Sequence, residues 1–89
     1  MTNIRPYFKF RISIDGIKRI TAELEDALYD ANSMDALLSV TKGIVSLTYH
    51  RQATSMSRAI EEAEKQIESV TLIDGTSLRV RGLHIVSDL

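Results

Sequence analysis

The chain has 89 residues, no cysteine, no tryptophan and a formal net charge of −1 at neutral pH. This length predicts one domain, and the lack of cysteine excludes disulfides, zinc–cysteinate sites and thiol catalysis. No apolar run approaches the roughly 20 residues needed to cross a bilayer, and no signal peptide opens the sequence, so we expect a cytoplasmic protein without a membrane partner.

Residues 7–14 alternate between apolar and polar side chains, which predicts a strand with one buried and one wet face. Pro6 suits the first position of such a strand, because its missing N–H costs little there. The inward set is Phe8, Phe10, Ile12 and Ile14, and the outward set is Tyr7, Lys9, Arg11 and Ser13.

A helix is predicted to follow this strand. Asp15 is the expected N-cap, since its carboxylate can accept from the first free amides of a helix. Apolar residues then recur at three- and four-residue steps from Ile17 to Ala31, which is typical of an amphipathic helix. Asn32 is expected to close it in the left-handed conformation. The outer face carries Glu23, Glu25, Asp26 and Asp30.

The middle of the chain predicts a β-hairpin from residues 36–41 and 44–50. Lys42-Gly43 between them is the turn signal, because glycine readily supplies the positive φ that tight hairpins need. The inward residues are Leu38 and Val40 on the first strand and Val45, Leu47 and Tyr49 on the second. Ser46, Thr48 and His50 are expected on the opposite face.

Ser55 is the expected N-cap of a second helix. Its buried face is predicted to hold Met56, Ala59, Ile60, Ala63, Ile67 and Val70, and its outer face Glu61, Glu62, Glu64 and Glu68. The Asp74-Gly75 turn then leads to a last strand over residues 77–81. Leu78 and Val80 face inward on it, and Ser77, Arg79 and Arg81 face outward. A further strand over residues 70–73, paired to the last one through the same turn, stays open as an alternative.

The order strand, helix, strand, strand, helix, strand predicts an α+β fold, a ferredoxin-like βαββαβ sandwich. Its four-stranded antiparallel sheet would carry both helices on one face, with the first strand central and the last strand beside it at an edge. We expect a single domain over residues 1–89, with a core over 6–81 and an unassigned tail over 82–89.

The predicted layout separates the charges. Lys9 and Arg11 are expected beside Arg79 and Arg81 on the open face of the sheet, whereas eight of the twelve acidic residues lie on the helices. Such a surface is an argument about partners rather than about fold. What covers the basic face remains open. The alternatives are solvent alone, an acidic protein surface, a second copy of the domain and nucleic acid. The candidate binding face comprises Tyr7, Lys9, Arg11, Ser46, Thr48, His50, Arg79 and Arg81.

RNA-recognition domains share this element order and stack bases on aromatic residues of their central strands. Their signature begins Lys/Arg-Gly and ends with an aromatic residue, as Lys42-Gly43 and Tyr49 do here. The internal stacking positions hold Ile44 and Ser46 instead, so nucleic acid is the weaker alternative.

Candidate chemistry is sparse. His50 and His84 lie far apart in the sequence, and no third metal ligand stands at helical spacing from either. An acid–base role for a histidine would need a positioned nucleophile or carboxylate, and no recognisable spacing supplies one. Asp15-Gly16 and Asp74-Gly75 lack the glycine-rich run of a phosphate loop. We therefore expect no catalytic residue, cofactor, metal site or small-molecule substrate.

Two segments carry a family resemblance. Residues 24–31 with 34–38, and residues 45–53 with Ser55 and Ala59-Ile60, resemble a family of small uncharacterised bacterial proteins. That family follows an "LYEAG" helix end with "DDA" and a strand, then "LDFxREA-S-x-x-x-A-I". Some members carry a C-terminal helix-turn-helix, which implies a regulatory or antitoxin-like setting. This chain departs from it, with Asn32-Ser33-Met34 for the frequent Gly-Cys-Asp and with Leu89 as its last residue where such a segment would begin.

Together these patterns predict a non-enzymatic bacterial interaction or regulatory domain that binds a protein partner or itself. The alternatives are nucleic-acid binding through the basic sheet face, and an inhibitor or antitoxin-like protein of a mobile element or defence locus.

Overall fold

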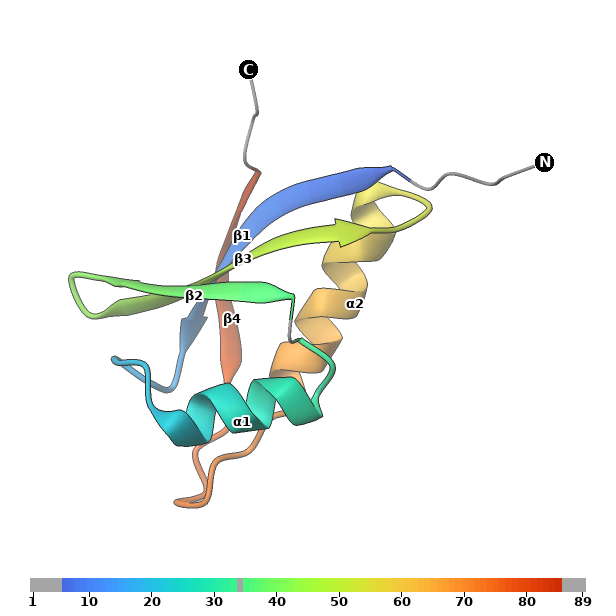
Figure 1. The fold of residues 1–89 in the computed structure, drawn as a ribbon. Coiled ribbons are helices and arrows are strands. Elements are labelled where there is room, and N and C mark those ends of the chain that lie inside the picture. The colour runs from blue at the N-terminus through green and yellow to red at the C-terminus, as the bar shows by residue number, and fades with distance from the viewer. Residues whose placement is uncertain (1–5, 34, 86–89) are drawn as a thin grey trace.

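The computed structural model describes residues 6–33 and 35–85. It has an α+β fold in which one four-stranded antiparallel sheet, in the order β2-β3-β1-β4, packs with two helices (Figure 1). The first strand is central and the last strand is its neighbour at one edge, as predicted. The elements are β1 (Tyr7–Asp15), α1 (Ala22–Asp30), β2 (Ala36–Thr41), β3 (Ile44–Gln52), α2 (Met56–Glu68) and β4 (Arg79–Ile85).

The core lies between the helices and one face of the sheet. Phe10, Ile12 and Ile14 are buried on β1, and Tyr49, Leu47 and Val45 lie directly opposite them on β3, in that order. Both helices contribute to this one cluster, and therefore both pack against the same face of the sheet. Their buried residues are Leu24 and Leu28 from α1 and Ala59, Ala63 and Ile67 from α2.

The start of α1 differs from the prediction. Asp15 is the last residue of β1, and the N-cap is Thr21, whose Oγ1 accepts a hydrogen bond from the amide of Leu24 at 3.1 Å. Gly16 has a φ of 108°, and a Cβ there would lie 2.9 Å from the carbonyl oxygen of Ser77. This close approach, which only glycine tolerates, turns the chain into a loop before the helix can begin.

The end of α1 and the hairpin follow the sequence closely. Asn32 has a φ of 65°, and Lys42 and Gly43 have φ values of 52° and 76° in a two-residue turn. Two successive positive φ values match a type I′ turn, whose twist suits a hairpin. Val40 shares its face with Leu38 as predicted, but it is 42% exposed.

The second helix begins after the predicted N-cap, since the Ser55 hydroxyl accepts from the Arg58 amide at 3.2 Å. Val70 is buried but follows the helix. The alternative strand over residues 70–73 does not form as a strand, but the pairing it implied is present as an isolated bridge between Thr71 and Ser77. The amide of Leu72 donates to the Thr76 carbonyl at 2.8 Å, and the amide of Gly75 donates to the Leu72 carbonyl at 2.9 Å within the turn.

The last strand begins at Arg79, later than predicted, and continues to Ile85. It thus takes in residues 82–85 of the tail that the sequence left unassigned, whereas 86–89 lie outside the described residues. A bulge interrupts its pairing, because Ser13 lies opposite Gly82 and Ile14 lies opposite Val80. The extra residue, Arg81, shifts the alternation, so that Leu83 comes to the helix side of the sheet.

Neither helix in the described part of the chain is long and apolar enough to cross a bilayer.

Candidate interaction face

The side of the sheet that faces away from the helices, here called the open face, carries the predicted binding residues. Directly opposite residues of an antiparallel pair project to the same side, so the register assigns β3 and β4 residues to the face of Lys9 and Arg11. Seven predicted residues follow from this register: Tyr7, Lys9 and Arg11 on β1, Ser46, Thr48 and His50 on β3, and Arg79 on β4. The eighth, Arg81, is the bulge residue.

The first half of β1 brings most of them together. The rings of Tyr7 and His50 lie 4.9 Å apart at an angle of 50°, and Lys9 lies opposite His50. Arg11 lies opposite Thr48, and its Nε donates to the Thr48 hydroxyl at 3.4 Å. These residues therefore form one continuous patch across the two central strands.

The two β4 arginines lie at the other end of β1. Arg79 is opposite Asp15, and Nη1 of Arg81 is 3.2 Å from the Asp15 carboxylate. The position beside Arg11 on β4 is held by His84. Because about 13 Å of strand separates Arg11 from Asp15, the expectation that Lys9 and Arg11 lie beside these arginines is wrong: the cations share a face but form two groups.

The helices carry the opposite charge. α1 has four carboxylates and no cation, and α2 has four carboxylates against Arg58 and Lys65. Arg58 and Lys65 pair with carboxylates of their own helix at 3.7 Å and 3.2 Å, in positions where more than half of each side chain is exposed. The helix side is therefore acidic, and the open face is basic except for Asp15.

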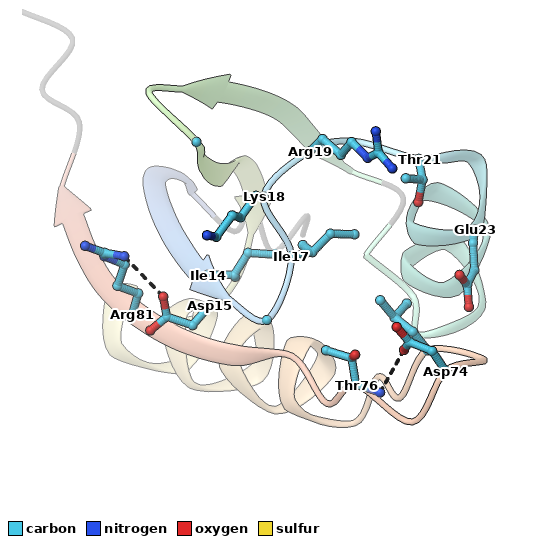
Figure 2. A pocket seen from close by; sticks show the side chains of 13 residues that line it. Ile14, Asp15, Ile17, Lys18, Arg19, Thr21, Glu23, Asp74, Thr76 and Arg81 are labelled. Atoms are coloured by element: carbon cyan, nitrogen blue, oxygen red, sulfur yellow. Dashed lines mark hydrogen bonds and ion pairs between the residues drawn. The ribbon is translucent and has the colours of Figure 1, made fainter.

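A groove of about 650 Å³ lies where β1 ends (Figure 2). Apolar side chains, including Ile14 and Ile17, line it together with charged ones. Its Asp74 carboxylate accepts the Thr76 amide at 2.9 Å, which lowers the pKa of that carboxyl below its ordinary 3.8. Glu23 of α1 accepts the Ile73 amide. Asp74 thus closes its own turn and Glu23 joins α1 to that turn, which gives both carboxylates a structural role.

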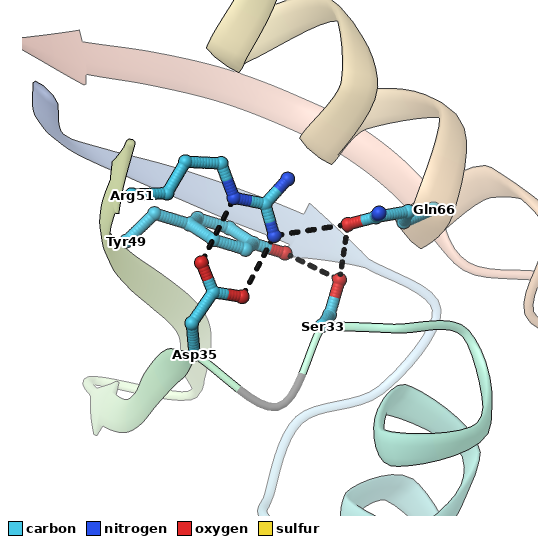
Figure 3. A network of polar contacts seen from close by, with 5 residues as sticks. All are labelled: Ser33, Asp35, Tyr49, Arg51 and Gln66. Carbon is cyan, nitrogen blue, oxygen red and sulfur yellow. Dashed lines mark hydrogen bonds and ion pairs between the residues drawn. The ribbon is translucent and has the colours of Figure 1, made fainter. Parts of the chain in front are cut away.

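The sequence interpretation missed a polar network at the margin of the core (Figure 3). Arg51 donates to both carboxylate oxygens of Asp35, from Nε at 2.8 Å and from Nη2 at 2.7 Å. Nη2 also reaches the side-chain oxygen of Gln66 at 3.0 Å. The Ser33 hydroxyl donates to the same oxygen at 3.0 Å and accepts from the Tyr49 hydroxyl at 3.1 Å. The network thus joins the loop before β2 to β3 and α2.

Burial determines the electrostatics of this network. It raises the pKa of Tyr49 above 10.0, although the bond to Ser33 and the charge of Arg51 oppose the shift. The guanidinium of Arg51 lies 4.7 Å from the centre of the Tyr49 ring. Burial alone would lower the pKa of Arg51, but the hydrogen bonds and charge of Asp35 outweigh it and raise that pKa above its ordinary value.

One signal for this network was present in the sequence. The inward alternation of Val45, Leu47 and Tyr49 continues to Arg51, which placed a cation on the core side of β3. A charge at such a position needs a partner. The identity of the partners depended on how the loop before β2 folds over α2.

In residues 6–33 and 35–85, no group of three or more histidine, cysteine, aspartate or glutamate side chains is placed to hold a metal ion. Comparison of the chain with protein-family models, with curated proteins and with solved structures gave no match.

Proposed function

We propose that this chain is a non-enzymatic, cytoplasmic interaction module with a ferredoxin-like sandwich fold, which binds an acidic protein surface through its open face. The strand order β2-β3-β1-β4 and the element order support this fold. Membership of the bacterial family that the chain resembles belongs to the same proposal, because that family implies a regulatory setting.

The observation that carries the proposal is the separation of charge between the two sides of the sheet. Four cations lie on the open face, with Asp15 as the acidic residue among the described positions there. Complementary charge steers encounter and suppresses wrong partners. The two groups of cations suit a partner whose acidic side chains are also spaced along an extended surface.

A matched pair of charge reversals tests the proposal. Lys9→Glu with Arg11→Glu reverses two cations on the open face, and Arg58→Glu with Lys65→Glu reverses two on α2, so both variants change the net charge equally. Proteins retained by the immobilised domain from a bacterial lysate are then quantified at low and at physiological salt. We expect the open-face variant to lose a salt-sensitive binder that the α2 variant keeps.

Equal loss from both variants would contradict the proposal, because only net charge would then matter. Retention of every binder by the open-face variant would contradict it as well. Folding of each variant is checked by its urea unfolding midpoint, because Lys9 is half-buried and Arg58 and Lys65 pair with carboxylates of α2.

Single-stranded nucleic acid is the second candidate, and the contact between Tyr7 and His50 favours it. Tyr7 is 61% exposed, and base stacking on such side chains contributes about 1–3 kcal/mol per base. The small number of cations on the open face nevertheless favours a protein partner over nucleic acid. Four cations release about four counterions at most, whereas tight DNA binders make roughly 6–10 phosphate contacts.

Fluorescence anisotropy with a labelled single-stranded oligonucleotide separates the two candidates. Binding that is lost in Tyr7→Ala, and that weakens steeply with salt, would favour nucleic acid. If neither DNA nor RNA binds at low salt, this second candidate is excluded.

A further inference from the structure

β2 is an edge strand without a charged residue. Its six residues, Ala-Leu-Leu-Ser-Val-Thr, contain neither proline nor a charge, and among the described strands it pairs with β3 alone. Natural edge strands usually carry charges or bulges that prevent pairing with another chain. The opposite edge, β4, has both, in Arg79 and the bulge at Arg81. The β2 edge is therefore the one open to strand addition.

Apolar side chains are exposed on both sides of this edge. Leu37 is 72% exposed on the open face, and Val40 is 42% exposed on the helix side. A groove of about 370 Å³ lies between β2 and α1, and Leu28, Leu38 and the 62% exposed Tyr29 line it. In Figure 1, α1 runs below β2.

We propose that β2 pairs antiparallel with β2 of a second copy, around a two-fold axis at Ser39, to give one continuous eight-stranded sheet. Two-fold pairing within one sheet requires opposite residues to share a face. With Ser39 on the axis, Leu38 lies opposite Val40 of the partner subunit on the helix side. Leu37 lies opposite Thr41 of the partner subunit on the open face. The exposed leucine and valine are thereby covered without any charge being buried.

Charge complementarity favours a second copy as the occupant. Lys42 is exposed at the hairpin tip and has no salt-bridge partner among the described residues. In the proposed register, Lys42 of the partner subunit lies opposite Ala36, next to Asp35. The Asp35 side chain is 35% exposed beside its bond to Arg51 and is therefore open to a second cation. The two-fold axis creates this contact twice.

The proposal goes beyond the proposed function, because it concerns the edge of the sheet and not its open face. The two surfaces share no charged residue, so variants of one leave the other intact. Self-association would also place two open faces side by side on one sheet.

Light scattering and sedimentation test the proposal with a matched pair of edge variants. Val40→Lys places an ammonium group in the proposed interface. The control, Leu83→Lys, places one on the opposite edge of the sheet, where Leu83 is 46% exposed on β4. We expect the unaltered chain and Leu83→Lys to sediment as dimers. Val40→Lys should raise the dimer Kd by about tenfold or more, because each interface would desolvate two unpaired charges.

A single introduced cysteine tests the register, since the chain has none of its own. Ser39→Cys should form an intermolecular disulfide under mild oxidation, because the two thiols would face each other across the axis. Ser57→Cys, exposed on α2, reports random collision. A monomer at all concentrations, a dimer abolished by Leu83→Lys alone, or equal cross-linking of both cysteine variants would overturn the proposal.

Discussion

Arg51 and Asp35 form a bidentate ion pair, with Nε 2.8 Å from Oδ2 and Nη2 2.7 Å from Oδ1. Only 10% of the Arg51 side chain is exposed, against 35% of Asp35. The pair fixes the residue that precedes β2 to the core side of β3. It therefore anchors the chain immediately before the uncharged edge strand.

Arg51→Ala should lower the free energy of unfolding by about 2 kcal/mol. Breaking a fully buried pair costs roughly 3–5 kcal/mol, and the exposure of Asp35 reduces that figure here. Urea unfolding with linear extrapolation measures it. The control is Arg58→Ala, which removes an exposed pair on α2 and should cost about 0.5 kcal/mol or less. Equal effects of the two variants would contradict a stabilising network.

Alkaline pH should destabilise the fold through Tyr49. Because burial raises its pKa above 10.0, the folded state holds its proton after the unfolded state has lost it. Stability is thus fully present below pH 10.0 and falls as pH rises toward the folded pKa, by at most about 1.4 kcal/mol per pH unit. Urea midpoints across this range measure the slope. Tyr49→Phe should flatten it, and an unchanged slope in that variant would assign the effect to other groups.

Gly16→Ala should destabilise the fold by about 2 kcal/mol, since an alanine there needs a φ of 108° and meets the Ser77 carbonyl. Gly82→Ala is the matched control, because its added Cβ meets nothing within 4 Å. That variant should lie within about 0.5 kcal/mol of the unaltered chain. Thermal unfolding of the two proteins side by side gives the comparison. Similar values would show that the loop after β1 relaxes freely.

Phe10→Ala should cost about 3–5 kcal/mol, enough to unfold much of so small a domain. Phe10 is fully buried, and its ring stacks on that of Tyr49 at 5.2 Å. Circular dichroism with urea titration measures the loss. The control Tyr7→Ala truncates an exposed ring of the same strand, and its effect should be small. A stable Phe10→Ala variant would show that the core repacks around the gap.

The two central strands were predictable because their side chains alternate between the one core of the domain and solvent. The alternation from Phe8 to Ile14 and from Val45 to Tyr49 identified both central strands and their buried faces correctly. The start of α1 was not predictable in this way, because Asp15 and Thr21 are both good N-cap residues. Ile17 and Ile20 continue the helical spacing, yet they pack on the core from a loop. The contact of Gly16 with Ser77, a non-local one, decides between the two starts.

The candidate face was predictable in its composition but not in its arrangement. The outward positions of β1 and β3 follow from alternation alone. The positions of the β4 arginines depend on the register of β4 against β1 and on the bulge at Arg81. No local sequence pattern predicts either feature. Beyond this bulge β4 continues to pair with β1 and includes His84, for which the sequence predicted no secondary structure. Val40 also escaped prediction, because alternation gives a face but not whether a helix reaches far enough to cover it.

The separation of charge has a practical consequence during purification. A molecule with carboxylates on its helices and cations on its sheet adsorbs in an orientation that depends on the resin. Near neutral pH, the net charge of −1 predicts retention on an anion exchanger. The open face should nevertheless hold the same protein on a cation exchanger at low ionic strength, in the opposite orientation. Its elution from either column therefore reports one side of the molecule and not the total charge.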